Sequence, residues 1–171
     1  MNDFVAAEYG IRQLHSRYVD AVWRKDAEAF GNCFAEDAEW RVGGSIMRGR
    51  DGIAEAMRGV FPRFQRILMT FRTPILEVGD GVASGRTYVS ENSVFADGRP
   101  FGPVGIYFER FVRQGAVWRF QWRLFQTNYA GPPDLSGTFF DVPDYGAPPA
   151  MPPLDEITID RSGSGPKQAG Q

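Results

Sequence analysis

Few of the side chains that usually carry out catalysis occur in this sequence. Its 171 residues include one histidine, His15, and one cysteine, Cys33. His15 follows Leu14 in a helical pattern and turns away from the apolar face, so we expect it at the surface or an interface and not in catalysis. Cys33 fits a small core residue better than a nucleophile. With so few ligand side chains and no nucleotide-binding glycine motif, the sequence predicts no metal and no cofactor.

Composition narrows the class of protein further. The chain carries 19 basic and 21 acidic residues, and a net charge of −2 offers no strong field for nucleic acid. Hydrophobic residues make up 43% and aromatic residues 14%, which indicates a globular protein with an aromatic interior. No apolar run reaches the length of a membrane span, and the first residues lack a signal-peptide pattern. We therefore expect a cytoplasmic protein that does not bind membranes.

The elements that must position a site follow from apolar periodicity. Helical spacing predicts a long helix over residues 4–24, a short helix after Asp26 and a third helix after Asp51. Alternating apolar residues predict strands at 38–42, 66–78, 82–95, 102–113 and 116–127. Helices followed by an antiparallel meander indicate an α+β fold, in which a strongly curved sheet wraps on the helices as a cone with an interior pocket.

Prolines mark the end of this domain. Eight of the twelve prolines lie between Pro132 and Pro166, where the missing backbone donors oppose helices and central strands. We therefore divide the chain into a domain at 1–130, an extended proline-rich, aromatic arm at 131–160 and a disordered tail at 161–171.

Short motifs within the domain resemble those of a known family. Asp26 precedes the run Phe34–Ala38, and the segments Gly85–Tyr88 and Trp118–Phe120 follow in predicted strands. In order and spacing these segments resemble the SnoaL-like branch of the NTF2-like superfamily over roughly residues 4–130. The resemblance implies a cone of three N-terminal helices packed on a strongly curved antiparallel sheet. It leaves the function open, because this fold hosts isomerases, dehydratases, cyclases, epoxide hydrolases and non-catalytic modules.

The resemblance assigns roles to single positions of the chain. Ketosteroid isomerases use two oxyanion donors, and the matching positions hold Tyr18 and Tyr107. Their general base falls at Val42, which cannot move a proton. The Asp and His of scytalone dehydratases and related enzymes fall at Trp23 and Met69. The resemblance therefore implies catalytic donors at Tyr18 and Tyr107 in a pocket without the usual proton acceptors.

The remaining matched positions concern residues expected to line the pocket and the side-chain amide of Asn92. Limonene-epoxide hydrolases have a tryptophan on the last strand, which Trp122 matches, but Leu124 stands where their acid would be. We expect Trp23 and Trp122 to line a flat, apolar pocket. A dehydratase histidine position maps to Asn92, which would orient a substrate or a water, or cap backbone near the mouth of the cone.

Pairing across the turn at Asp97-Gly98 predicts which side chains share the inner face of the sheet. This register places Arg86 opposite Glu109 and Tyr88 opposite Tyr107. The inner face of the strand would then carry Arg86, Tyr88, Ser90 and Asn92. Either Glu109 acts as a base and Arg86 as an anion anchor, or the two form a structural ion pair. We favour the ion pair, because buried charges are usually paired.

Two functions fit these features. The first is a cofactor-free lyase or isomerase for a small apolar cyclic substrate, in which Tyr18 and Tyr107 stabilise an oxyanion. In that reaction Asn92 or Glu109 would assist proton transfer. The second is a non-catalytic ligand-binding or dimerisation module that has lost the Asp–His dyad. The polar residues predicted on the inner face favour the enzyme.

An apolar outer face of the sheet predicts a protein partner. We expect Ile106, Phe108, Val117 and Phe125 to point outward, and we expect a homodimer through this face, as in many relatives. The arm would cross to the second copy or cover the edge of the sheet. Besides this second copy, the only partner that the sequence predicts is the small apolar molecule in the pocket.

Overall fold

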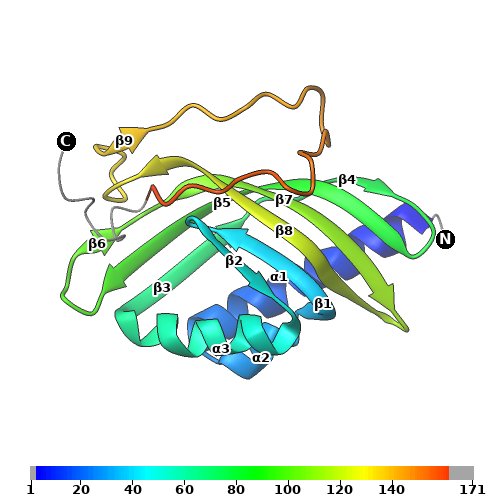
Figure 1. Ribbon diagram of the computed structural model, residues 1–171, viewed down its shortest axis with the longest axis horizontal. Helices are drawn as coiled ribbons and strands as arrows, with labels where there is room; N and C mark the ends of the chain where they lie inside the picture. The colour runs from blue at the N-terminus through cyan, green and yellow to red at the C-terminus, as the bar shows by residue number, and fades with distance from the viewer. Residues whose placement is uncertain (1–2, 162–171) are drawn as a thin grey trace.

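The helices follow the predicted order. A computed structural model describes residues 3–161 of the chain (Figure 1). Helix α1 (Asp3–Arg24) is followed by α2 (Ala27–Gly31), α3 (Arg50–Val60) and the 3-10 turn η1 (Phe61–Arg63). Asp26 caps α2 as predicted, because its side chain accepts a hydrogen bond from the backbone N–H of Ala29 at 2.9 Å. Within residues 3–161, no helix combines the length and the hydropathy needed to cross a membrane.

The described strands form one sheet. They are β1 (Phe34–Val42), β2 (Ser45–Arg48), β3 (Phe64–Phe71), β4 (Ile75–Val78), β5 (Val82–Phe95), β6 (Pro100–Phe101), β7 (Val104–Gln114), β8 (Val117–Ala130) and β9 (Thr138–Phe139). Their order is β2-β1-β8-β7-β5-β3, with β4 and β6 paired to β5 and β9 paired to β8. The predicted strand at 66–78 is divided into β3 and β4, because Pro74 lacks the donor that would continue it.

The sequence had indicated an antiparallel sheet, but the sheet is mixed. Strand β1 runs parallel to β8, whereas the other neighbours are antiparallel. The reason lies in the chain path: β3 starts at the far edge of the sheet, and the meander β5-β7-β8 returns to β1 from there. The strongly curved α+β cone that the sequence predicts is confirmed.

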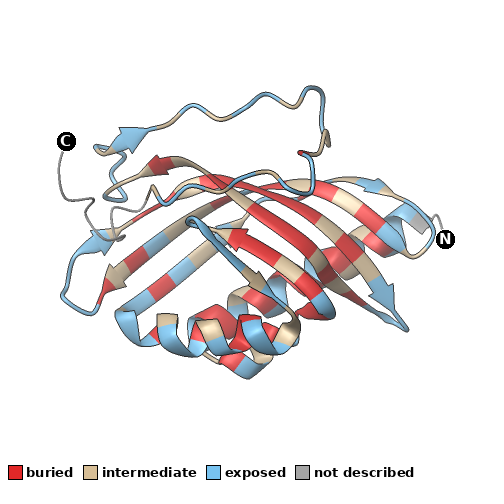
Figure 2. Ribbon diagram, viewed as in Figure 1, coloured by how far each residue is buried: buried red, intermediate tan, exposed pale blue. Residues whose placement is uncertain are grey.

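The helices and the arm lie on opposite sides of the sheet (Figure 1). On the concave side, Ile11, Leu14 and Tyr18 of α1 are at most 2% exposed and share one apolar cluster with Phe111 and Phe120. Burial is accordingly concentrated in the central strands and on the sheet-facing sides of the helices (Figure 2). Burial of these aromatic and aliphatic side chains supplies the main force that holds α1 in the curve of the sheet.

The proline-rich arm crosses the convex side of the sheet (Figure 1). Its Tyr145 and Met151 pack on a second apolar cluster that the strands contribute, namely Ile106, Phe108, Trp122 and Leu124. Ile106 and Phe108 therefore point outward as predicted, and the chain's own arm covers them. The part of the predicted tail from residue 162 onward lies outside the described residues.

Candidate active site

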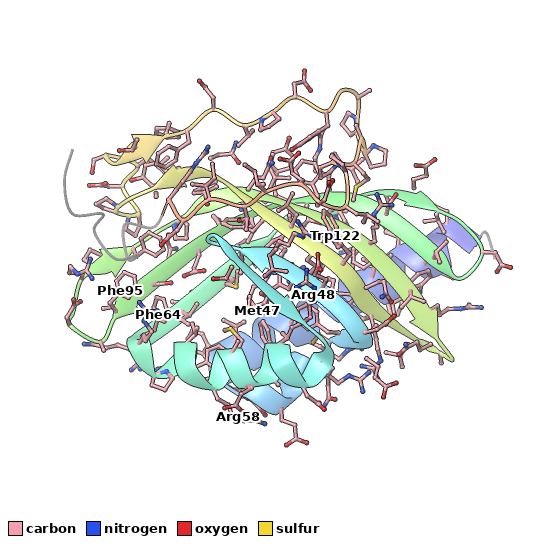
Figure 3. All side chains as sticks on the ribbon, viewed as in Figure 1. Met47, Arg48, Arg58, Phe64, Phe95 and Trp122 are labelled. Carbon is pink, nitrogen blue, oxygen red and sulfur yellow. The ribbon has the colours of Figure 1, made fainter. Side chains whose placement is uncertain are left out.

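A cavity of about 1110 Å³ lies between the helices and the concave face of the sheet. Its walls are mostly apolar and include Trp40, Val42, Met47, Met57, Phe64 and Met69. Val42 and Met69 thus line the cavity as predicted. Figure 3 shows Met47 above α3, and Phe64 and Phe95 side by side on paired strands with ring centroids 4.7 Å apart. An apolar, concave space of this size suits a small organic molecule.

Two phenols reach this cavity from opposite layers. Tyr18 comes from α1 and Tyr107 from the inner face of β7, and both line the space. The two phenols are near enough that each influences the pKa of the other. Burial raises the pKa of Tyr18 well above 10 and also raises the pKa of Tyr107, so both phenols stay protonated at neutral pH. A protonated phenol has an O–H that can donate a hydrogen bond to a ligand.

A carboxylate that the sequence reasoning missed also lines the cavity. Glu91 lies on β5 opposite Met69 of β3, and its side chain is half-buried. Ser93, two residues along the same face of the strand, donates a hydrogen bond to it. Burial raises the pKa of Glu91 to about 7, and the hydrogen bond from Ser93 offsets only part of that effect. A carboxyl with this pKa can both take and return a proton near neutral pH.

The predicted pairing of β5 with β7 is wrong by one residue. Arg86 lies opposite Phe108, Thr87 lies opposite Tyr107, and Glu109 faces Gly85. Strands β6 and β7 pair with β5 in the same register, so the shift arises at the turn before β6. The backbone N–H of Phe95 donates to the carbonyl of Arg99 at 2.9 Å, which leaves three residues, 96–98, in the loop where the sequence had indicated a two-residue turn. A shift of one residue moves every side chain of a strand to the other face.

This shift removes four predicted residues from the cavity. Arg86, Tyr88, Ser90 and Asn92 all lie on the outer face of β5, and the cavity lining contains none of them. Tyr88 is 44% exposed, Asn92 is exposed, and Ser90 accepts a hydrogen bond from Nη1 of Arg72 at 2.9 Å. The inner face of the strand carries Thr87, Glu91 and Ser93 instead.

Glu109 is locked in a buried cluster and does not line the cavity. Its partner is Arg123 and not Arg86: Nε of Arg123 donates to Oε1 at 2.9 Å, and Nη2 lies 2.8 Å from the same oxygen. Thr87 donates to Oε2 at 2.7 Å, and Nε2 of His15 lies 3.0 Å from Oε2. Burial by itself raises the pKa of Glu109, but its interactions with His15, Arg123 and Thr87 outweigh burial and lower it.

His15 is buried, which corrects the expected surface position. It is 4% exposed and stacks on Phe71 with ring centroids 5.0 Å apart. The physical reason is that the curved sheet covers the flank of α1 beside Leu14 as well as the face that carries Leu14. One histidine of unremarkable sequence context gave no signal for this contact.

Arg123 connects the cluster to the phenols. Its guanidinium carbon lies 3.7 Å from the ring centre of Tyr107 and 4.4 Å from that of Tyr18. The side chain is fully buried, and its positive charge opposes the rise that burial causes in the pKa of both phenols. Arginine over an aromatic ring is attracted by the negative ring face, so this contact also fixes the two rings in place.

Both tryptophans predicted to line the cavity lie elsewhere. Trp23 is 57% exposed and lines a separate groove of about 600 Å³ between α1 and β3, because it is one helical step beyond Val22, which does face the cavity. Trp122 lies on the convex face under the arm. A bulge between Phe120 and Trp122 reverses the alternation of β8 and turns Phe125 inward, although it was expected to point outward.

Neither metal chemistry nor thiol chemistry is indicated at this site. Among residues 3–161, no three His, Cys, Asp or Glu side chains form a group that could hold a metal ion. Cys33 is buried in the core as expected, and burial raises the pKa of its thiol to about 11. The cavity lining does include two phenols and the carboxyl of Glu91.

The fold and the site together define a class of small proteins in which three helices and a curved sheet enclose an apolar ligand cavity. Residues 3–123 match the family model for the SnoaL-like domain. The chain belongs to this SnoaL-like family, and its fold is that of NTF2-like proteins.

Solved structures share this fold at low sequence identity. A hexachlorocyclohexane dehydrochlorinase from Novosphingobium barchaimii LL02 is 23% identical with a TM-score of 0.69, over 82% of this chain and 98% of that one. A provisionally assigned scytalone dehydratase from Novosphingobium aromaticivorans is 19% identical with a TM-score of 0.72, over 92% and 99%. A provisionally assigned aromatic ring hydroxylase from the same species is 28% identical with a TM-score of 0.67, over 77% and 92%. No curated protein matches the chain.

Proposed function

We propose that this protein is a cofactor-free lyase or isomerase that moves a proton on a small apolar cyclic substrate in the cavity. The observation that carries the proposal is the position of Glu91, whose pKa is raised to about 7, in the same cavity as the phenols of Tyr18 and Tyr107. The names of two structural neighbours, a dehydrochlorinase and a scytalone dehydratase, describe eliminations and so favour the same type of reaction.

Glu91 is the base of the proposed reaction. Its carboxylate takes a proton from the carbon next to a substrate carbonyl, and the electron pair of the C–H bond moves to the carbonyl oxygen. For an isomerase, Glu91 returns the proton to a different carbon. For a lyase, a carbon–oxygen bond breaks, a double bond forms and Glu91 gives the proton to the departing oxygen. Each route restores the starting carboxylate and needs no redox partner.

The phenols supply the oxyanion donor of the proposed reaction. Tyr18 and Tyr107 keep the roles that the family resemblance implies, and Glu91 replaces the proton movers expected at Asn92 and Glu109. A protonated phenol in an apolar cavity stabilises a negative oxygen more strongly than water does, because little solvent competes for the charge. Apolar walls such as Trp40 and Met47 favour a cyclic hydrocarbon body over a polar one.

One observation favours the non-catalytic alternative. The family's acid and histidine positions hold Val42, Trp23 and Met69, so the proton movers of the related enzymes are missing. A binding module with the same cavity would take up cyclic ketones without changing them. The two functions therefore differ in one measurable property, the exchange of substrate protons.

The homodimer and the cytoplasmic location predicted from the sequence remain part of this proposal. The arm already covers Ile106 and Phe108 on the convex face. A dimer through this face would therefore use the arm as part of its surface, together with exposed side chains such as Tyr88.

Proton exchange into deuterated water tests the catalytic proposal without a known substrate. Cyclic ketones of the steroid and polyketide type are incubated with the protein, and loss of the α-proton signal is followed by NMR. We expect Glu91→Gln to slow exchange by about 10²-fold or more, and Tyr107→Phe by about 10-fold or more. Glu77→Gln makes the same chemical change on the exposed face of β4 and is the matched control.

The pH dependence provides a second readout of the same base. A base must be ionised, so the exchange rate of the wild-type protein should rise with pH and level off above about pH 7. Wild-type protein that binds these ketones but exchanges no proton would support the binding module. A Glu91→Gln variant that exchanges as fast as the wild type would remove Glu91 from the mechanism.

A further inference from the structure

The last residue of the arm, Asp160, and the residue directly after it, Arg161, form part of the rim of the cavity. Asp160 and Arg161 line the cavity together with Arg63 of η1. The family model matches only residues 3–123, so the arm contributes side chains that the matched region does not contain. The rim therefore carries charged side chains from outside the region that matches the family model.

Arg161 is held in a fixed orientation. Its Nη1 donates to the backbone carbonyl of Thr127 at 3.0 Å and to that of Asp141 at 3.1 Å. The guanidinium also lies over the ring of Phe140, with its carbon 4.8 Å from the ring centre. Both hydrogen bonds use Nη1, and within residues 3–161 no acceptor is bonded to the edge formed by Nε and Nη2. An arginine edge of this geometry binds a carboxylate through two parallel hydrogen bonds.

The backbone before Arg161 is fixed as well. Nη1 of Arg41 donates to the carbonyl of Glu156 at 3.0 Å, and Oγ1 of Thr158 lies 3.5 Å from the carbonyl of Phe125. Arg41 is itself buried on β1, where Nε donates to Glu39 at 2.6 Å. These contacts attach the last described residues of the arm to β1 and β8, so little conformational freedom is left to lose when a ligand binds.

Charge is distributed unevenly along the cavity. Arg63 and Arg161 are its only basic lining residues among those described, and both lie at the rim, where Asp160 makes interactions of its own within the protein. The rest of the lining is apolar apart from Ser45, Thr127, the two phenols and Glu91, whose pKa burial raises to about 7. A negatively charged group is repelled by Glu91 and attracted by the two arginines, so it is favoured at the rim.

We propose that Arg161, with Arg63, binds the carboxylate of an amphipathic cyclic acid whose ring system fills the cavity. This inference deepens the proposed function and depends on its choice of this cavity as the substrate site. It names the substrate class as cyclic carboxylic acids and assigns to the arm the recognition of their charged end.

A matched pair of ligands tests this inference by binding alone. Isothermal titration calorimetry compares 2-naphthoate with the neutral 2-naphthamide on the full chain at low salt. We expect the carboxylate to bind about 10-fold more tightly, and Arg161→Gln to remove most of this preference without weakening the amide. Arg58→Gln is the control, because Arg58 extends away from the cavity on the outer side of α3, beside Glu55 (Figure 3).

The salt dependence of the wild-type protein tests the inference without any variant. Screening should bring the two affinities together as ionic strength rises, because only the carboxylate gains from the arginines. Equal affinities at low salt, a preference that salt leaves unchanged, no binding of either probe, or an equal loss of both ligands in Arg161→Gln would each overturn the inference. A wild-type protein that prefers the carboxylate but exchanges no α-proton would refute the proposed catalysis and leave this inference standing.

Discussion

Replacement of Glu109 by glutamine should destabilise the protein strongly. The change keeps the size of the side chain and removes its negative charge, so it leaves the fully buried guanidinium of Arg123 without the counter-ion that now lies 2.8 Å from it. Removing one member of a buried ion pair costs about 3–5 kcal/mol. A domain is stable by about 5–15 kcal/mol, so this loss is a large part of the total.

Urea denaturation gives the magnitude directly. With a slope of about 2 kcal/mol per molar urea, the midpoint of unfolding should fall by about 2 M for Glu109→Gln at pH 7. Glu77→Gln makes the same change at an exposed position and should shift the free energy of unfolding by less than about 0.5 kcal/mol. Adding Arg123→Met to Glu109→Gln should cost less than the two single changes summed, since no buried charge then lacks a partner.

The stability difference between the wild type and Glu109→Gln should depend on pH. Burial raises the pKa of Glu109, but its interactions with His15 and Arg123 lower it below its ordinary value overall. A carboxyl whose pKa is lower in the folded state stabilises the fold above its unfolded pKa, about 4.3, and this contribution is lost as the pH falls through the folded pKa. The difference between wild type and Glu109→Gln should therefore be full at pH 6–8 and shrink below about pH 4. A cost under about 1 kcal/mol at pH 7, or a difference that persists in acid, would refute the electrostatic account.

Two further predictions concern the core and the arm. The thiol of Cys33, with a pKa of about 11, should react with Ellman's reagent only as the protein unfolds, and rapid reaction in the folded state would contradict its burial. A chain ending at Ala130 should expose the cluster of Ile106 and Phe108 that Tyr145 covers, so gel filtration should show aggregates or a loss of the proposed dimer. A dimer that the truncation leaves unchanged would exclude the arm from its interface.

Much of the fold was predictable because it depends on local patterns. Helical spacing placed α1, and the side chain of Asp26 marked the start of α2, since a cap needs only one acceptor in the right position. The parallel pairing of β1 with β8 depends on where the meander ends in space, and no local pattern contains that information. Tyr18 and Tyr107 were found at the cavity because the family resemblance gave their positions.

The strand residues of the site were missed for one physical reason, the side-chain period of two in a strand. The loop at 96–98 is one residue longer than the expected turn and shifts the register of β5 against β7, so Arg86 and Asn92 move outward while Glu91 moves inward. A bulge in β8 likewise turns Trp122 to the outer face of the sheet. The signal that the sequence did contain was weak. Glu91 is one residue from Asn92, and which of the two faces inward depended on the length of the loop at 96–98.

Two glutamates on the inner face of the sheet have pKa values shifted in opposite directions: that of Glu91 is raised and that of Glu109 is lowered. This difference distinguishes a structural carboxylate from one that could transfer a proton. Burial raises the pKa of both, but Glu109 is surrounded by Arg123, His15 and Thr87, whereas the one hydrogen bond that the Glu91 carboxylate accepts within residues 3–161 comes from Ser93. Glu109 therefore stays ionised and holds Arg123 against the rings of the two tyrosines. Glu91 faces the cavity with a proton that it can gain or lose near neutral pH. Environments that push the pKa values of two carboxyl groups apart in this way are typical of acid–base sites with divided roles, and the difference favours Glu91 as the base of the proposed reaction.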